Sequence, residues 1–252
     1  MSVPGRSRFA VTATTTLSPE TVSGFETVGG DWLCWSRWCW RLPHAIARGV
    51  RRILDWLTVH ASTLVVAERW WRYYVDLHAA LPAAPPEVHL TPVTDELVAD
   101  LRRRPDGDAN QLQSGFRFWE HGLRGAFIWL GADGPYCLQW LLTARDNALL
   151  RTLPVWAGIY PTLADDGGAV ENLYGFGRVH RGAPAPCTLF EYALYHHAKS
   201  LGLATLLTHI SVENAAAQRW AQRTGWSVFG EIARYRIDLR GLRHFHLYLH
   251  TT

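Results

Sequence analysis

The feature that most constrains the fold lies between Ala169 and Trp226, where two strand patterns enclose a helix pattern. Residues 169–179 are rich in strand-forming side chains, and residues 203–212 form a continuous apolar run, typical of a strand covered on both faces. Between them, residues 188–201 repeat apolar side chains at the helical period. A connection of this length joins two parallel strands and packs its helix across them. The sequence therefore predicts a mixed α/β sheet.

A basic turn, residues 180–186, stands between the first of these strands and the helix. The start of a helix attracts anions because its first N–H groups lack partners and the helix dipole is positive there. Pro184 and Pro186 each remove one such N–H group. Thr188 and Glu191 fit a capping box, in which the helix satisfies its own first donors, and a Glu191 carboxylate would oppose an anion. The donors left in the turn are Arg181 and the amides of Gly182, Ala183, Ala185 and Cys187.

The segments before and after this unit continue the alternation of strands and helices. Downstream, Asn214 can cap a short helix that ends at Gly225, and residues 228–239 and 244–250 alternate like a closing antiparallel pair. The elements expected upstream are a strand at residues 87–90, helices at 94–104 and 110–121, and a hairpin of strands at 125–131 and 136–144.

This order of elements resembles the GNAT superfamily of acyl-CoA-dependent N-acyltransferases, over roughly Glu87 to Leu239. The residues that carry the resemblance are Val212-Glu-Asn214 and Gly225-Trp226, where the family usually has Val-x-Asn and Gly-Phe. The resemblance implies a GNAT-like central mixed sheet flanked by helices, in which the strands around the crossover helix splay apart and receive the pantetheine arm. It also implies an N-acyltransferase that moves an acetyl or other acyl group from acetyl-CoA or another acyl-CoA to an amine by direct attack.

The resemblance places the pyrophosphate of coenzyme A on the turn that ends at Cys187, and it places Asn214 where the family's asparagine contacts the cofactor or supports the site. A plain N-cap is the alternative role of Asn214. The cofactor-binding residues implied in this way are Val179, Arg181, Gly182, Ala183, Ala185, Cys187 and Asn214. We expect no metal, because His196-His197 has no partner at metal-ligand spacing.

Two residues of the first strand are candidates for catalysis. Glu171 is the first choice for the general base, because many members of the family have a carboxylate on this strand, and Tyr174 is a donor near the same gap. A solvated strand end for Glu171 and a core aromatic for Tyr174 are the alternatives. The family often has a tyrosine seven residues after its asparagine, which protonates the departing thiolate, whereas this chain has Ala221 there. A non-catalytic GNAT-fold binding protein with a degenerate CoA site is therefore a second hypothesis, and an acyltransferase that uses carrier-bound acyl groups is a third.

The N-terminal part of the chain differs in composition, with seven of the thirteen tryptophans between Trp32 and Trp71. Residues 81–86 contain three prolines and are the best linker in the chain. We therefore expect an N-terminal arm and Trp/Arg-rich extension at residues 1–80 and a GNAT-like acyltransferase domain at residues 81–252. An aromatic strand at residues 69–77 would have to pair with that domain.

An amphipathic stripe within residues 31–60 has three interpretations. Its apolar face can dock on the domain, or the Trp/Arg-rich segment can lie on a membrane surface as a peripheral contact. An acyl-carrier protein, which is acidic, is a further candidate partner for its arginines.

Composition limits the kinds of partner and the cellular compartment that we expect. The net charge of +3 is mild and gives no reason to expect nucleic acid, so the expected partner is a small-molecule or peptide amine. The four cysteines show neither Cys-x-x-Cys pairing nor metal spacing, which indicates reduced thiols. No apolar segment reaches the length of a signal peptide or a membrane span. These features predict a cytoplasmic protein.

Overall fold

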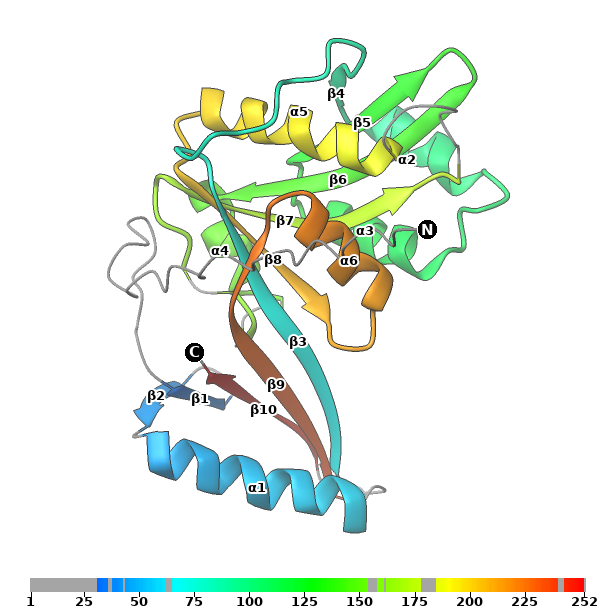
Figure 1. Ribbon diagram of the computed structural model, residues 1–252. Helices are drawn as coiled ribbons and strands as arrows, with labels where there is room; N and C mark the ends of the chain where they lie inside the picture. Colours follow the sequence, from blue (N-terminus) through cyan, green and yellow to red (C-terminus); the bar gives the residue numbers. More distant parts are fainter. Residues whose placement is uncertain are drawn as a thin grey trace, which may run out of the picture.

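The apolar run predicted at residues 203–212 forms β8 (Thr205–Ser211), a strand inside a ten-stranded sheet (Figure 1). The computed structural model describes residues 31–35, 38–42, 44–61, 65–153, 158–160, 162–177, 185–239 and 243–251. The other strands are β1 (Asp31–Trp35), β2 (Trp38–Leu42), β3 (Val65–Asp76), β4 (Leu90–Pro92), β5 (Ala126–Gly131), β6 (Gly134–Thr143), β7 (Gly167–Gly175), β9 (Ser227–Leu239) and β10 (Arg243–Thr251). The helices are α1 (His44–His60), α2 (Asp95–Arg102), α3 (Asn110–Glu120), α4 (Asn147–Leu150), α5 (Pro186–Ser200) and α6 (Ala215–Arg223), with a 3₁₀ turn η2 (Ala144–Asp146).

The strands lie in the order β2-β1-β10-β9-β3-β8-β7-β6-β5-β4. In the part of the chain that the structure describes, β7 and β8 are parallel and the other neighbouring pairs are antiparallel. The predicted mixed sheet flanked by helices is therefore confirmed. The predicted crossover helix is α5, and the predicted hairpin and closing pair are β5–β6 and β9–β10.

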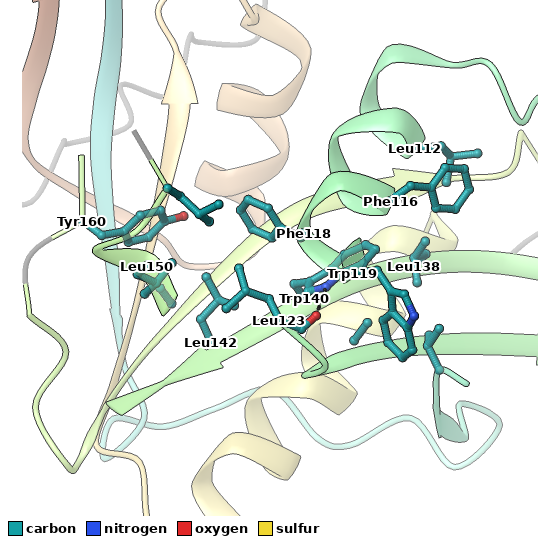
Figure 2. Packing of buried hydrophobic residues seen from close by; sticks show 14 of the residues in the cluster. Leu112, Phe116, Phe118, Trp119, Leu123, Leu138, Trp140, Leu142, Leu150 and Tyr160 are labelled. Atoms are coloured by element: carbon teal, nitrogen blue, oxygen red, sulfur yellow. Dashed lines mark hydrogen bonds between the residues drawn. The ribbon is translucent and has the colours of Figure 1, made fainter. Parts of the chain in front are cut away.

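The two faces of the sheet are covered by different helices. Successive side chains of a strand point to opposite faces, so Leu138 and Trp140 of β6 pack with α3, whereas Leu141 packs with α5. On the α3 face, Phe118 meets Trp140 edge to face, with ring centroids 6.2 Å apart, and the Trp140 indole donates to the carbonyl of Leu123 at 3.1 Å (Figure 2). This packing fixes β6, and β6 in turn positions β7.

The aromatic strand expected at residues 69–77 is β3, and it lies between β8 and β9, antiparallel to both. Its side chains Tyr73 and Val75, together with the adjacent Leu77, are buried in the core under α5. The boundary expected at residue 81 therefore separates segments of sequence that share one sheet.

Helix α1 docks on the sheet through one side and exposes apolar residues on the other. Ala47 and Leu54 are buried against β3, β9 and β10, and Arg69 donates to Asp55 at 2.7 Å. The docking interpretation of the amphipathic stripe is thus the one seen in the structure. The opposite side exposes Ile46, Ile53, Trp56 and Val59, at 53–73% of their area. Contact of this side with a membrane stays a prediction.

A chain that begins at residue 81 tests how far the sheet depends on β3. Burial of a large apolar side chain contributes roughly 1.5–3 kcal/mol, and a domain's whole stability is about 5–15 kcal/mol. Loss of Tyr73, Val75 and Leu77, and of the strand that pairs with both β8 and β9, should therefore abolish cooperative unfolding in circular dichroism. A chain that begins at residue 44 keeps β3 and should unfold cooperatively. A cooperative, native-like transition of the shorter chain would contradict this account.

Candidate functional site

The strands β7 and β8 pair over three residues and then separate. Their register joins Gly167 to Thr205, Gly168 to Leu206 and Ala169 to Leu207. Beyond these pairs, β7 stays bound to β6 as far as Gly175, and β8 stays bound to β3 as far as Ser211. Figure 1 shows the two strands running apart. This is the splayed arrangement that the GNAT resemblance implies.

A β-bulge lies on β7 just after the point of separation. The register with β6 passes from Trp140 opposite Glu171 to Leu138 opposite Tyr174, so two residues of β7 face one residue of β6. One of the two, Asn172, has a φ of 57°, a left-handed conformation that asparagine tolerates better than most residues. A bulge bends its strand and re-aims the neighbouring side chains. It therefore contributes to the opening between β7 and β8.

Glu171 and His209 face each other at this opening. Each stands two residues beyond the last pair of its strand, and the side chains are 8% and 2% exposed. The Glu171 Oε1 lies 3.3 Å from the His209 Nδ1, at the long end of the hydrogen-bond range. An ionised carboxylate only accepts, so the proton of a neutral His209 sits on Nδ1 and the Nε2 lone pair is free to act as a base. In the described residues, this buried Nε2 has no hydrogen-bond partner.

Burial sets the protonation of the groups around this pair. Burial lowers the pKa of His209, against the opposing effect of the Glu171 carboxylate. Burial also lowers the pKa of His250 to about 3, helped by the charge of Arg72, and the His250 Nε2 donates to the Gly158 carbonyl at 2.8 Å. The Tyr160 ring stands edge to face on His209, with centroids 4.9 Å apart, and burial raises the pKa of its hydroxyl. Both histidines are therefore neutral at pH 7.

Of the two predicted catalytic residues, the structure brings Glu171 into this cluster. Tyr174 projects further along β7, and its hydroxyl lies 3.5 Å from the Asp106 Oδ2. Burial raises the pKa of Tyr174, and the Asp106 carboxylate adds to the effect. The structure therefore does not place the Tyr174 hydroxyl with Glu171 and His209, and a catalytic role of Tyr174 stays a prediction.

Sequence reasoning missed His209 and Arg72. A histidine inside the apolar run at residues 203–212 was a visible signal, because buried strands rarely carry one. No comparable signal marked Arg72, because an arginine is ordinary in a strand with one exposed face. The pairing of β3 with β8 brings Arg72 opposite His209.

The capping box expected at Thr188 and Glu191 is wrong. Helix α5 begins at Pro186, with Ala185 as its N-cap, because proline suits the first position of a helix. Glu191 consequently lies in the second turn, where it is fully buried, and burial raises its pKa to about 8. A group with this pKa is mostly uncharged at pH 7. An uncharged Glu191 does not repel an anion at this end of α5, contrary to the expectation from the sequence.

The start of α5 also brings two thiols together. The Sγ atoms of Cys187 and Cys137 are 3.3 Å apart, and both cysteines are free. A Cβ at Gly175 would lie 2.9 Å from the Cys187 Sγ, so glycine at this position makes room for the thiol. The hydrogen bond from Cys137 lowers the pKa of Cys187, whereas the same contact raises the pKa of Cys137. Cys187 is therefore the thiol closer to ionisation.

The remaining predicted cofactor-binding residues divide into two groups. Asn214 is the N-cap of α6, where its Oδ1 accepts from the Ala217 N–H at 3.0 Å, so it fills the plain capping role. Ala185 and Cys187 lie at the start of α5. The residues of the basic turn that fall outside the described part of the chain are Val179, Arg181, Gly182 and Ala183.

In the ranges that the structure describes, no group of three His, Cys, Asp or Glu side chains is placed to hold a metal ion. Among the same residues, none of the helices combines the length and the apolar character needed to cross a membrane.

Comparison with known proteins gives distant likenesses in structure. No protein-family model matches the chain, and no curated protein sequence matches it. A glucosamine N-acetyltransferase region of a fungal multi-domain β-N-acetylglucosaminidase is 12% identical with a TM-score of 0.49, over 79% of this chain and 23% of that one. A GCN5-related N-acetyltransferase from Sphaerobacter thermophilus is 10% identical with a TM-score of 0.45, over 88% and 76%. A GNAT-family acetyltransferase from Novosphingobium aromaticivorans is 12% identical with a TM-score of 0.43, over 75% and 66%.

The chain spans less than a quarter of the fungal protein. All three TM-scores are below 0.5, so these likenesses say nothing about the activity of this chain.

The pKa of His250 makes a prediction about stability and pH. Between pH 6.5 and pH 3 the unfolded chain binds a proton at this residue and the native protein does not, so the free energy of unfolding falls as the pH falls. The loss between pH 7.5 and pH 5 is about 2 kcal/mol, at about 1.4 kcal/mol per pH unit below the unfolded pKa. We expect His250→Gln, which keeps a donor for Gly158, to remove this part of the loss in urea titrations. His78→Gln, at an exposed position, is the control; equal losses in the two variants would contradict the assignment.

Proposed function

We propose that the chain is an N-acyltransferase of the GNAT type, which transfers an acetyl or other acyl group from an acyl-CoA to an amine. The observation that carries the proposal is the pair of Glu171 and His209 at the point where β7 and β8 separate. The pair supplies a buried base, and the separation supplies a strand edge without a strand partner. Direct acyl transfer to an amine requires a base of this kind beside a held thioester.

A buried polar atom at the bulge supports the binding of a polar ligand there. Buried side-chain atoms are normally hydrogen-bonded, and exceptions call for an explanation. The described atoms without a partner of normal geometry include Gln139 Oε1, Asn172 Nδ2, both Glu191 carboxyl oxygens and Trp226 Nε1. Burial raises the pKa of Glu191, whereas Trp226 and Gln139 lower it through hydrogen bonding, so these three side chains are neighbours of one another beneath α5. The Nδ2 of Asn172, at the bulge itself, is therefore the buried donor of this set that is left for an amide oxygen of a pantetheine arm.

The start of α5 supports the binding of the phosphate end of acyl-CoA. No side chain caps this helix, and the Thr188 and Leu189 N–H groups donate to the Ala185 carbonyl, so one early N–H group is left for an anion. This group is the amide of Cys187, the first N–H group of a helix that begins with Pro186. The second hypothesis, a non-catalytic protein with a degenerate CoA site, rests on the prolines of the turn and on Ala221.

The proposed chemistry follows from the neutral state of His209. Acyl-CoA supplies a thioester carbonyl when bound. The Nε2 of His209 takes a proton from the acceptor nitrogen as the new C–N bond forms, and Glu171 orients the ring and stabilises the imidazolium. The C–S bond then breaks, and His209 returns its proton to the departing sulfur. Because His209 acts first as the base and then as the acid, the departing thiolate needs no tyrosine hydroxyl at the position of Ala221.

Substitution of the pair tests the proposal. A positioned general base contributes about 10²–10⁴-fold to the rate, so His209→Ala should lower kcat by about that factor. Glu171→Gln leaves a hydrogen-bonding group but removes the charge, and we expect a smaller loss. Release of CoA from acetyl-CoA, followed by chromatography over a panel of amines, is the measurement.

His197→Ala is the matched control, because this histidine lies on α5 against Phe127 and outside the pair. Its kcat should equal that of the unchanged protein. An unaltered kcat in both His209→Ala and Glu171→Gln would overturn the assignment of the base.

A further inference from the structure

The guanidinium of Arg72 is an unpaired cation beside the proposed base. Arg72 stands directly opposite His209 in the register of β3 and β8. Its Nε is buried without a hydrogen-bond partner, and no described carboxylate forms an ion pair with it. Its contact is with the ring of Phe229, 4.3 Å below the guanidinium carbon. Burial lowers the pKa of Arg72 to about 10, so it still carries its charge at pH 7.

Two neighbouring arginines of this part of the sheet have acidic partners. Arg69, three residues before Arg72 on β3, donates to Asp55 at 2.7 Å. Arg234 on β9 pairs with Glu68. Buried charges in proteins are normally paired, because an unpaired one loses its hydration without compensation. The missing partner of Arg72 therefore calls for an anion that is not part of the described chain.

The groups around Arg72 do not neutralise it. Burial keeps His209 and His250 uncharged by lowering the pKa of each, and Tyr160 is kept uncharged by a raised pKa. The carboxylate of Glu171 is engaged with the His209 Nδ1. The site thus offers an available cation and an available base on neighbouring strands.

The spacing of these two groups limits the ligand. Burial and the charge of Arg72 both lower the pKa of His209, so the guanidinium lies near the imidazole as well as over the Phe229 ring. A guanidinium binds a carboxylate through two parallel hydrogen bonds, whereas the His209 Nε2 accepts from an amine. A molecule that carries an amine and a carboxylate close together can therefore contact both groups.

We propose that the acceptor is a free amino acid, whose carboxylate binds Arg72 while its amine faces His209. The amine half rests on the proposed function. The carboxylate half rests on Arg72 and its surroundings alone, so it can be tested without acyl transfer.

The experiment compares matched ligands in a thermal shift assay without CoA. The probes are the N-acetyl derivatives of the twenty amino acids and the carboxamides of the same compounds. We expect at least one acid to raise the melting temperature, with a Kd at least tenfold below that of its amide. A ligand that binds the native state alone stabilises it by mass action.

Variants of Arg72 decide whether that preference comes from this residue. Arg72→Met should abolish the preference for acid over amide, and Arg72→Lys should reduce it, because lysine keeps the charge but lacks the planar fork. Arg103→Met, at an exposed position, should keep it in full. If Arg72→Met does not fold, the reduction in Arg72→Lys decides.

The proposal is overturned if no acid of the panel binds, if acid and amide bind alike, or if both Arg72 variants keep the full preference. Its failure is distinct from that of the proposed function. Binding of acids without any acyl transfer would contradict the function alone, whereas transfer to amino-acid amides as fast as to the acids would contradict the role of Arg72 alone.

Discussion

The short pairing of β7 and β8 is the constraint on which the rest of the site depends. β7 remains bound to β6, and β8 remains bound to β3, so the two strands separate while each keeps a partner on its far side. Both strands therefore stay in the sheet although they separate from each other. It leaves a backbone edge for a ligand and sets Glu171 and His209 at the end of the remaining pairs.

Burial then decides the chemistry of the residues at that opening. A solvated histidine would be partly protonated near neutral pH, whereas the lowered pKa of His209 keeps it available as a base. Glu171 and Arg72 lie on either side of His209, on β7 and β3. Glu171 is hydrogen-bonded to the imidazole, whereas Arg72 has no anionic partner among the described residues. The order of these three side chains across β7, β8 and β3 gives the proposed acceptor its orientation.

Local patterns were sufficient to predict the crossover unit, the class of the sheet and the position of Glu171 on its strand. The periods of strands and helices can be recognised from residues that are close together in the sequence. They could not predict His209 and Arg72 as neighbours, since strand register joins residues that are distant in the sequence. The error at Glu191 has a similar origin. Its spacing from Thr188 suits a capping box, but Pro186 begins the helix earlier and turns Glu191 towards the core.

Hydrogen–deuterium exchange with and without acetyl-CoA tests the central claim most directly. If the thioester arm lies between β7 and β8, the ligand should slow exchange of the backbone amides at residues 170–177 and at the start of α5, with no change in β9 and β10. An acetyl-CoA concentration that stabilises the protein yet leaves residues 170–177 unchanged would contradict the claim, because the ligand would then bind elsewhere.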